Sequence, residues 1–305
     1  MPEAFYLARW DGGRQQLEWV RRIGCLPRVA SLNLSDDGWV AVGTDRTTLW
    51  WRWDDAADAP PRKAGLHVAV TTGFFSGERL LALAAQYRLD DMLRRAPVPT
   101  VFNPIAGSRN EAERLGDPAP MKQPVGLSVC HSPGKGRPLL YVTDAATKQI
   151  WRTGLQLHDL RPDQGKWQAV RLGAELRAPS DIAALTDGRL LLADQGSIML
   201  LEPDEDGFRV AWQFDRWGEE PSQRFGRRLR FAVDGAWMVV SDTDRHRLCW
   251  LDWAERNLLG QFGETDKAGD DAGHLESPTL VSLRGTRAVV ADAGNQRVLK
   301  LMLAP

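Results

Sequence analysis

Short apolar stretches alternate with turns rich in Gly, Asp and Asn along much of the chain. Two of them align residue for residue, RLRFAVDGAWMVVSDTDRHRLCWLDW from Arg228 and PTLVSLRGTRAVVADAGNQRVLKLML from Pro278. Each predicts a short strand, a turn, a second strand ending in Asp, a turn ending in Arg, and a third strand. Similar copies begin at Pro179 and at Pro124. The resulting period of about 50 residues predicts a repeat protein.

The N-terminal part keeps this rhythm less clearly. The copy from Arg28 has Gly43 in place of the strand-ending Asp, and the copy from Leu66 lacks it. The second half of the Leu66 copy fits both helix and strand periods, and the repeat favours a strand. A fourth strand is predicted after several copies, at Trp167–Leu172, Val210–Phe214 and Leu258–Phe262.

Six copies of a four-stranded sheet account for almost the whole chain. Packing such sheets radially buries both of their faces and leaves only short edges. The pattern therefore predicts an all-β fold, a β-propeller of six four-stranded blades that forms one domain over residues 1–305. The strand expected at Leu17–Ile23 would be the fourth strand of the last blade and close the ring. FYLARW, residues 5–10, predicts a further strand without an assigned place.

Composition narrows the function. The chain is 43% hydrophobic and 26% charged, as soluble globular proteins are, and its net charge of -1 creates no global attraction to nucleic acid or membrane. Its three cysteines fit neither a disulfide framework nor a zinc motif. No apolar run reaches the roughly 18 residues that span a bilayer, and the N-terminus does not resemble a signal peptide. We expect a cytoplasmic protein without a membrane partner.

The motifs VADAGNQRVLKL and VSDTDRHRLCWL resemble the NHL-repeat family of β-propellers, as does GETDKAGDDAGHLESPTLVSL. The resemblance covers somewhat over half of the chain. It implies a propeller that binds protein or RNA, although the family also includes a zinc-dependent lyase. Similar six-bladed propellers serve as calcium-dependent lactonases. Fold alone does not select among these functions.

The repeated motif residues are expected to be structural. A carboxylate at the end of a strand, as at Asp242 and Asp292, accepts backbone N–H groups from the following turn. Arg247 and Arg297 are close enough in sequence to pair with these aspartates. Gly294 and Asn295 suit a turn that needs positive φ.

The stretch QRFGRRLRF, residues 223–231, carries candidate binding residues at the start of the fifth blade. Arg227 and Arg228 should lie near the mouth of the axial channel, on the same face as Arg245 and His246, and Arg224 would extend the patch. One interpretation is a site for a phosphate, an acidic peptide or an RNA strand. The other pairs the arginines with acids close in sequence, namely Glu219, Glu220, Asp242 and Asp244.

A second candidate surface is the third strand of the first blade. Trp51 and Trp53 share one face of that strand, and Trp50 and Arg52 share the other. Packing between blades is one explanation for these residues. A protein interface is the other, because Trp and Arg are both enriched in interfaces.

Catalysis would need metal ligands in the axial channel. A zinc site requires three converging histidines from the five in the chain, which are His67, His131, His158, His246 and His274. A calcium site would need oxygen ligands, for which Asn33, Asp181 and Glu276 are the candidates. No nucleophile elbow, P-loop or dinucleotide motif is present. We expect no cofactor and no bound metal.

The leading hypothesis is a non-catalytic binding or scaffolding module, which holds a protein partner and acts alone or as a subunit of a larger complex. The first alternative is RNA or another polyanion bound by the arginines of the fifth blade, with Phe225 as the one nearby aromatic for base stacking. The second is a metal-dependent lyase or lactonase that works in the axial channel.

Overall fold

The computed structural model describes residues 5–11, 16–24, 29–35, 38–44, 48–55, 62–63, 68–76, 79–86, 97–102, 113–114, 120–130, 138–156, 161–162 and 167–303. Nearly all regular structure in these ranges is β-strand, with two short 3-10 helices, η1 (Pro221–Gln223) and η2 (Thr243–Arg245). None of the described segments is a helix long and apolar enough to cross a bilayer.

The described strands form six sheets in which most neighbouring strands are antiparallel. Sheet 1 contains β3 (Val29–Leu34), β4 (Trp39–Thr44), β5 (Thr48–Arg52) and β6 (Arg62–Lys63). Sheet 2 contains β7 (Val68–Ser76), β8 (Arg79–Gln86), β9 (Pro97–Phe102) and β10 (Glu113–Arg114). Sheet 3 contains β11 (Pro124–Cys130), β12 (Leu139–Asp144), β13 (Gln149–Gln156), β14 (Arg161–Pro162) and β15 (Gln168–Ala169).

The C-terminal half supplies the other three sheets. Sheet 4 contains β16 (Arg171–Leu172), β17 (Pro179–Ala184), β18 (Leu190–Asp194), β19 (Ser197–Asp204) and β20 (Gly207–Phe214). Sheet 5 contains β21 (Leu229–Asp234), β22 (Trp237–Asp242), β23 (Arg247–Asp252) and β24 (Asn257–Phe262). Sheet 6 contains β25 (Pro278–Arg284), β26 (Arg287–Asp292) and β27 (Arg297–Met302), together with β1 (Phe5–Asp11) and β2 (Gln16–Gly24).

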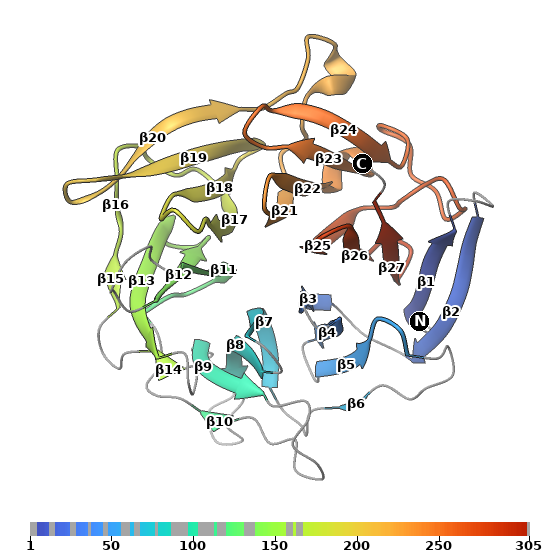
Figure 1. The fold of residues 1–305 in the computed structure, drawn as a ribbon, viewed down its shortest axis with the longest axis horizontal. Helices are drawn as coiled ribbons and strands as arrows, with labels where there is room; N and C mark the ends of the chain where they lie inside the picture. Colours follow the sequence, from blue (N-terminus) through green and yellow to red (C-terminus); the bar gives the residue numbers. More distant parts are fainter. Residues whose placement is uncertain are drawn as a thin grey trace.

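Figure 1 shows these sheets arranged around a central axis, with β3, β7, β11, β17, β21 and β25 innermost. The predicted all-β propeller fold is confirmed. The segment from Arg79 to Gln86, which fits both periods, forms the strand β8. We call the innermost strand of each sheet a and the following strands b, c and d. The b–c face is the face that carries the b–c turns, which are residues 145–148, 195–196, 243–246 and 293–296 in sheets 3 to 6.

The strand that closes the ring is not the one that the sequence predicted. β1 pairs in parallel with β27, through Tyr6 with Arg297 to Arg9 with Lys300, and is therefore the fourth strand of sheet 6. β2, which contains the predicted Leu17–Ile23, pairs with β1 and lies outside it as a fifth strand. The apolar pattern of the two strands is similar, so only the pairing could decide between them.

The predicted strand at Trp167–Leu172 is also divided between two sheets. β15 pairs antiparallel with β13 in sheet 3, whereas β16 pairs in parallel with β20 in sheet 4. The chain thus crosses from one sheet to the next at Val170, whose N–H still bonds to the carbonyl of Ile150 at 2.8 Å. With β15 in sheet 3, β16 in sheet 4 and β2 in sheet 6, three of the six sheets have five described strands rather than four.

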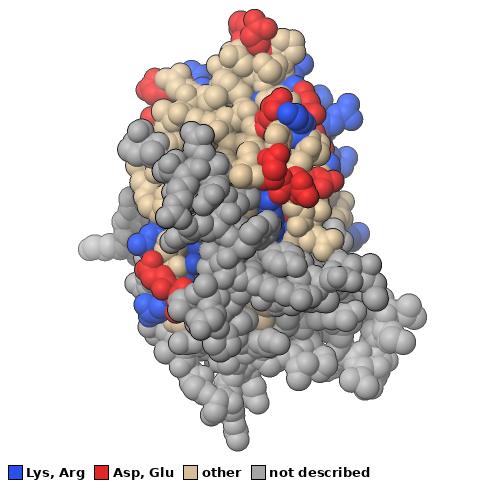
Figure 2. Space-filling view, turned by 90° about the vertical axis from the view of Figure 1, so that its right-hand side faces the viewer, with Lys and Arg blue, Asp and Glu red and all other residues tan. Residues whose placement is uncertain are grey.

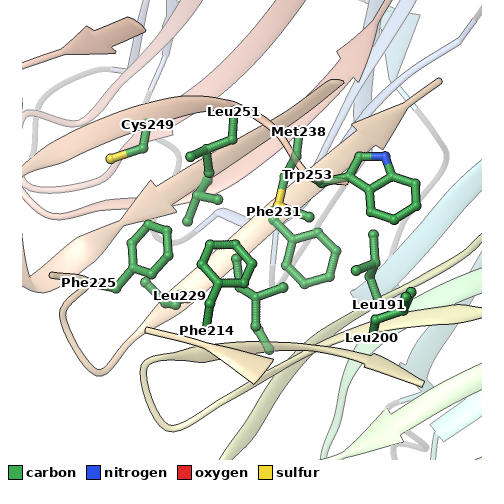
Figure 3. Close-up of a cluster of buried hydrophobic side chains, with 13 residues drawn as sticks. Leu191, Leu200, Phe214, Phe225, Leu229, Phe231, Met238, Cys249, Leu251 and Trp253 are labelled. Atoms are coloured by element: carbon green, nitrogen blue, oxygen red, sulfur yellow. The ribbon is translucent and has the colours of Figure 1, made fainter. Parts of the chain in front are cut away.

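The apolar core lies between neighbouring sheets, because alternate residues of a strand point to opposite sides. On β22, Met238 and Val240 pack against sheet 4, whereas Val239 packs against sheet 6. Figure 3 shows the layer between sheets 4 and 5, where Phe214 faces Phe231 and Leu251. Both faces of sheet 5 are therefore buried between its two neighbours, which explains why its b and c strands are almost continuously apolar.

Serine hydroxyls also join the innermost strands of neighbouring sheets. Ser128 accepts the N–H of Ala184 at 2.8 Å, and Ser180 donates to the carbonyl of Leu229 at 2.6 Å. Ser282 of sheet 6 accepts the N–H of Leu34 in sheet 1 at 2.9 Å. These bonds satisfy backbone groups near the axis, where strands of different sheets approach without a continuous ladder.

Candidate binding face

A buried aspartate at the end of each b strand in sheets 3 to 6 shapes the b–c face. Each carboxylate accepts backbone N–H groups from the segment that leads into the a strand of its own sheet. Asp144 accepts from Lys122 and Gln123, both at 2.8 Å, and Asp194 from Arg177 and Ala178. In the same way, Asp242 accepts from Gly226 at 3.0 Å and Asp292 from Glu276 at 2.7 Å. The repeated Asp therefore fixes the backbone that leads into the innermost strand of its sheet.

In sheets 5 and 6 a buried arginine completes this arrangement. Arg247 pairs with Asp242 at 3.0 Å, and Arg297 pairs with Asp292 at 2.6 Å. The predicted Asp–Arg pairs are confirmed. Each guanidinium also donates to carbonyls of the preceding d–a connection, for example Arg297 to the carbonyl of His274 at 2.6 Å. Both arginines are therefore structural and are not available to a ligand.

The electrostatics of the Asp242 pair reflect its burial. Removal from water raises the pKa of Asp242 to about 6, although Arg247 and the N–H of Gly226 act in the opposite direction. Burial likewise raises the pKa of Asp292, against its hydrogen bond with Asn295 and the charge of Arg297. Each carboxyl group nevertheless stays in direct contact with its arginine.

The left-handed residues of the b–c turns differ from those predicted. Positive φ occurs at the residue before the c strand, with values of 54° for Lys148, 55° for His246 and 51° for Gln296, and not at Gly294 or Asn295. Gly294 is needed for space, because a Cβ there would lie 2.3 Å from the side chain of Glu276. The Asn295 side chain instead donates to Asp292 and to the carbonyl of Gly269.

Three of the predicted binding arginines are neutralised by acids. Arg228 pairs with Asp244 at 2.5 Å and Arg224 pairs with Asp215 at 3.2 Å. Arg245 pairs with Asp266 through two bonds, at 2.9 and 2.7 Å, and also donates to the carbonyl of Pro221. Of the four acids named from the sequence, only Asp244 pairs with one of these three. Figure 2, which views the molecule from one edge, shows basic and acidic side chains side by side on the described part of that surface.

The remaining residues of the predicted patch have different roles. His246 is half-buried, and its Nδ1 accepts the N–H of Ser277 at 3.1 Å, which joins sheet 5 to sheet 6. Arg227 is exposed, and its backbone N–H bonds to Asp244 at 2.9 Å. Its side chain has no ion pair or hydrogen bond with any other residue that the structure describes. Within this patch on the fifth blade, Arg227 is therefore the arginine whose charge meets no acid among the described residues.

Two further exposed cations lie just before the a strands of sheets 3 and 4, as Arg227 does before the a strand of sheet 5. Lys122 and Arg177 each stand two residues before the a strand, are exposed, and have a backbone N–H fixed by the buried Asp. Neither side chain pairs with another residue within the described ranges. We call Lys122, Arg177 and Arg227 the mouth cations. Sequence reasoning missed Lys122 and Arg177, although both precede an aligned Pro by two residues; the corresponding residues are Gly226 in sheet 5 and Glu276 in sheet 6.

The predicted Trp and Arg surface of the first blade is corrected in part. Trp51 is only 2% exposed and packs with Leu34, Val42 and Val289 between sheets 1 and 6, so it is not a binding residue. Arg52 is exposed, and its guanidinium lies 4.7 Å from the ring centre of Trp39. The side chain of Trp50 lies outside what the structure describes.

A charged pair lies at the innermost strands of sheets 4 and 5. The Asp181 carboxylate accepts N–H groups from Phe231 and Ile182, both at 3.0 Å. Arg230 donates to the carbonyl of Val125 in sheet 3. Desolvation raises the pKa of Asp181 and lowers the pKa of Arg230, and each charge partly offsets the shift of the other. The pair joins the a strands of three successive sheets beside the axis.

Metal-ligand geometry is not found in the described ranges, where no three His, Cys, Asp or Glu side chains gather closely enough to hold an ion. His274 contacts Asp271 at 2.7 Å and Glu264 at 3.2 Å on the exposed connection before β25. His67, His131 and His158 lie outside the described residues. Asp181 already accepts two backbone N–H groups, so the residues that are described do not fit a calcium or zinc centre.

The buried thiols are also unsuited to chemistry. Cys249 is fully buried, and its desolvation raises the pKa of the thiol to about 12. The pKa of Cys130 is raised for the same reason. A thiol that stays protonated at neutral pH is a poor nucleophile.

Comparison with known proteins supports the fold and leaves the function open. No family model matches the chain, and no curated protein matches it in sequence. Among solved structures, a chain of a nidogen/laminin complex is 14% identical with a TM-score of 0.59, covering 87% of this chain and 89% of that one. The periplasmic gluconolactonase of Pseudomonas aeruginosa is 13% identical with a TM-score of 0.59, covering 94% and 84%. An auxiliary nutrient binding protein from Bacteroides thetaiotaomicron is 12% identical with a TM-score of 0.61, covering 90% and 69%.

Proposed function

We propose that this chain is a non-catalytic binding module that holds a protein partner on its b–c face, as a scaffold or as a subunit of a larger complex. The observation that carries the proposal is the set of mouth cations, Lys122, Arg177 and Arg227. They are exposed and unpaired among the described residues, whereas Arg224, Arg228 and Arg245 on the same face are neutralised.

The mouth cations are suited to recognition for two reasons. The backbones of Lys122 and Arg177 are held by buried carboxylates and that of Arg227 by the half-buried Asp244, so little conformational freedom is lost when a partner binds. Cations from successive sheets also present a row of positive charge that selects an acidic surface. An NHL-repeat ancestry, a single domain over residues 1–305 and a cytoplasmic location are further parts of this proposal.

Protein is favoured over RNA as the partner. Phe225, the aromatic that the sequence offered for base stacking, is only 6% exposed and packs against Phe214 and Trp217. Recognition of single-stranded RNA relies on exposed aromatic faces. With a net charge of -1, the chain also lacks the general positive field of most nucleic-acid binders.

The test is an affinity pull-down of the tagged chain from its native cytosol, with and without nuclease, read by mass spectrometry. We expect a stoichiometric protein partner that survives nuclease and is recovered at least tenfold less by the variant Arg177→Glu/Arg227→Glu. Arg256→Glu is the control, because this exposed residue lies in a c–d turn on the opposite face. Equal recovery by the double variant would contradict the proposal, and recovery of RNA would replace the protein partner by a nucleic acid.

Lactone hydrolysis in the axial channel is the second candidate. It is favoured by Asp181, a carboxyl group with a raised pKa beside the axis, which is a common property of catalytic acids and bases. The similar fold of a periplasmic gluconolactonase is a second argument for this candidate. Assays of the purified chain with gluconolactone, with added calcium or with a chelator, are expected to show no turnover above buffer. Turnover that disappears in Asp181→Asn would replace the binding proposal by this one.

A further inference from the structure

A groove of about 570 Å³ opens on the b–c face between sheets 3 and 4. One wall is the end of the b–c turn and the start of β13, from Lys148 to Ile150, and the other is the segment from Ala169 to Leu176. The groove exists because the chain leaves β13 after Val170 and joins β20 at Arg171.

The lining combines an apolar floor with a basic rim. Ile150, Val170 and Leu176 form the floor and are at most 6% exposed. Lys148 and Arg171 stand on the rim, and the lining contains one acid, Glu175. An apolar floor with polar groups at its edge is the usual composition of a site that binds a side chain.

A ligand can pair with the two rim cations, Lys148 and Arg171, without breaking a strong interaction within the protein. Lys148 has no ion pair with another described residue. Arg171 pairs with Asp206 at 3.3 Å, but both side chains are 77% exposed. An exposed pair of this kind contributes little to stability, so a ligand carboxylate can replace Asp206 as the partner of Arg171.

The groove also leads to two of the mouth cations. Leu176 in its lining directly precedes Arg177, whose N–H is bound by Asp194. On the other wall, Lys148 ends the turn that begins at Asp144, and this carboxylate binds the N–H of Lys122. Exposed cations therefore occur both in the groove lining and on the segments that lead into β11 and β17.

Given the binding function proposed above, we infer that this groove holds an extended acidic segment of the protein partner. One apolar side chain of the segment occupies the floor, its carboxylates pair with Lys148 and Arg171, and the rest of it runs toward Lys122 and Arg177. Peptide is favoured over single-stranded nucleic acid because the groove lining contains no aromatic side chain on which a base could stack.

The experiment measures the fluorescence anisotropy of a labelled synthetic peptide with one central Leu flanked by Glu residues. We expect saturable binding to the full chain that weakens at least tenfold when the Glu residues are replaced by Gln. The variant Lys148→Glu/Arg171→Glu should lose at least tenfold in affinity, and Arg256→Glu should bind as the unchanged chain does. The single variant Arg171→Glu is measured as well, because replacing this mostly exposed side chain should leave the fold unchanged.

Three results would overturn the inference. They are the absence of saturable binding, equal affinity of the Glu and Gln peptides, and equal affinity of the groove variants and the unchanged chain. The pull-down separates this failure from that of the proposed function. If Lys148→Glu/Arg171→Glu still recovers the partner while Arg177→Glu/Arg227→Glu does not, the function stands and the groove is not its site.

Discussion

Replacing Arg247 by Met is expected to lower the free energy of unfolding by about 3–5 kcal/mol, the usual cost of removing one member of a buried ion pair. Asp242 would remain as a buried carboxylate without its counter-charge. The carbonyls of Ser222 and Arg224 and the hydroxyl of Thr265 would also lose a donor. Denaturant unfolding followed by tryptophan fluorescence measures the change.

Arg209→Met is the matched control for this prediction. Arg209 also pairs with a carboxylate, Glu202 at 2.5 Å, but its side chain is 59% exposed. Such surface pairs contribute about 0–1 kcal/mol. A loss at Arg247 no larger than the loss at Arg209 would show that the buried pair does not hold the connection between β20 and β21.

The pH dependence of the Arg247→Met variant gives an independent check. Arg247 lowers the pKa of Asp242 toward its value of about 6, so its removal raises that pKa further. A carboxyl whose folded pKa is raised loses stability as the pH rises through that pKa, because the unfolded chain ionises more easily. The deficit of the variant relative to the unchanged chain should therefore grow from pH 6 upward and be smaller below it.

Trp51→Ala is expected to cost about 3–5 kcal/mol, as large-to-small changes of buried aromatics do. The Trp51 ring fills the layer between sheets 1 and 6 with Leu49, Val289 and Val298. The two sheets come from opposite ends of the repeat region, so the cavity would weaken the closure of the ring. A lower thermal midpoint and a lower denaturant midpoint are the expected observations.

Arg52→Ala is the neighbouring control, since this exposed side chain only covers the ring of Trp39. Its removal should change stability by no more than about 1 kcal/mol. If Trp51→Ala were stable but failed to recover the protein partner in the pull-down, Trp51 would be an interface residue after all, and its burial would not describe the chain in solution.

The repeated motif was informative because its role is local. The Asp at the end of the b strand and the Arg five residues later are joined by a single turn, so their pairing at Asp242–Arg247 and Asp292–Arg297 could be predicted from spacing. The bonds from each carboxylate to the segment before the a strand of its own sheet were not predicted. Those N–H groups lie about 16 to 22 positions earlier in the chain, at Gly226 and Lys122 for example.

The partners of the arginines depended on longer-range geometry. Arg224 pairs with Asp215, and Arg245 pairs with Asp266. Both acids lie in irregular connections between strands, whose path cannot be predicted from residue propensities. The side chain of Arg228 pairs with Asp244, whereas the side chain of the adjacent Arg227 meets no described partner. Adjacent arginines with the same composition around them cannot be told apart by sequence alone.

The sequence by itself determined the repeat, the strands and the propeller, because alternating polarity and turn residues act within a few positions of one another. Tertiary structure alone decided three things: that β1 and not β2 pairs with β27, that Trp51 is buried, and that Lys122, Arg177 and Arg227 find no acidic partner among the described residues. Each of these depends on contacts between sheets or between strands far apart in the chain. The energy of such contacts depends on distance in space, which the order of residues does not contain.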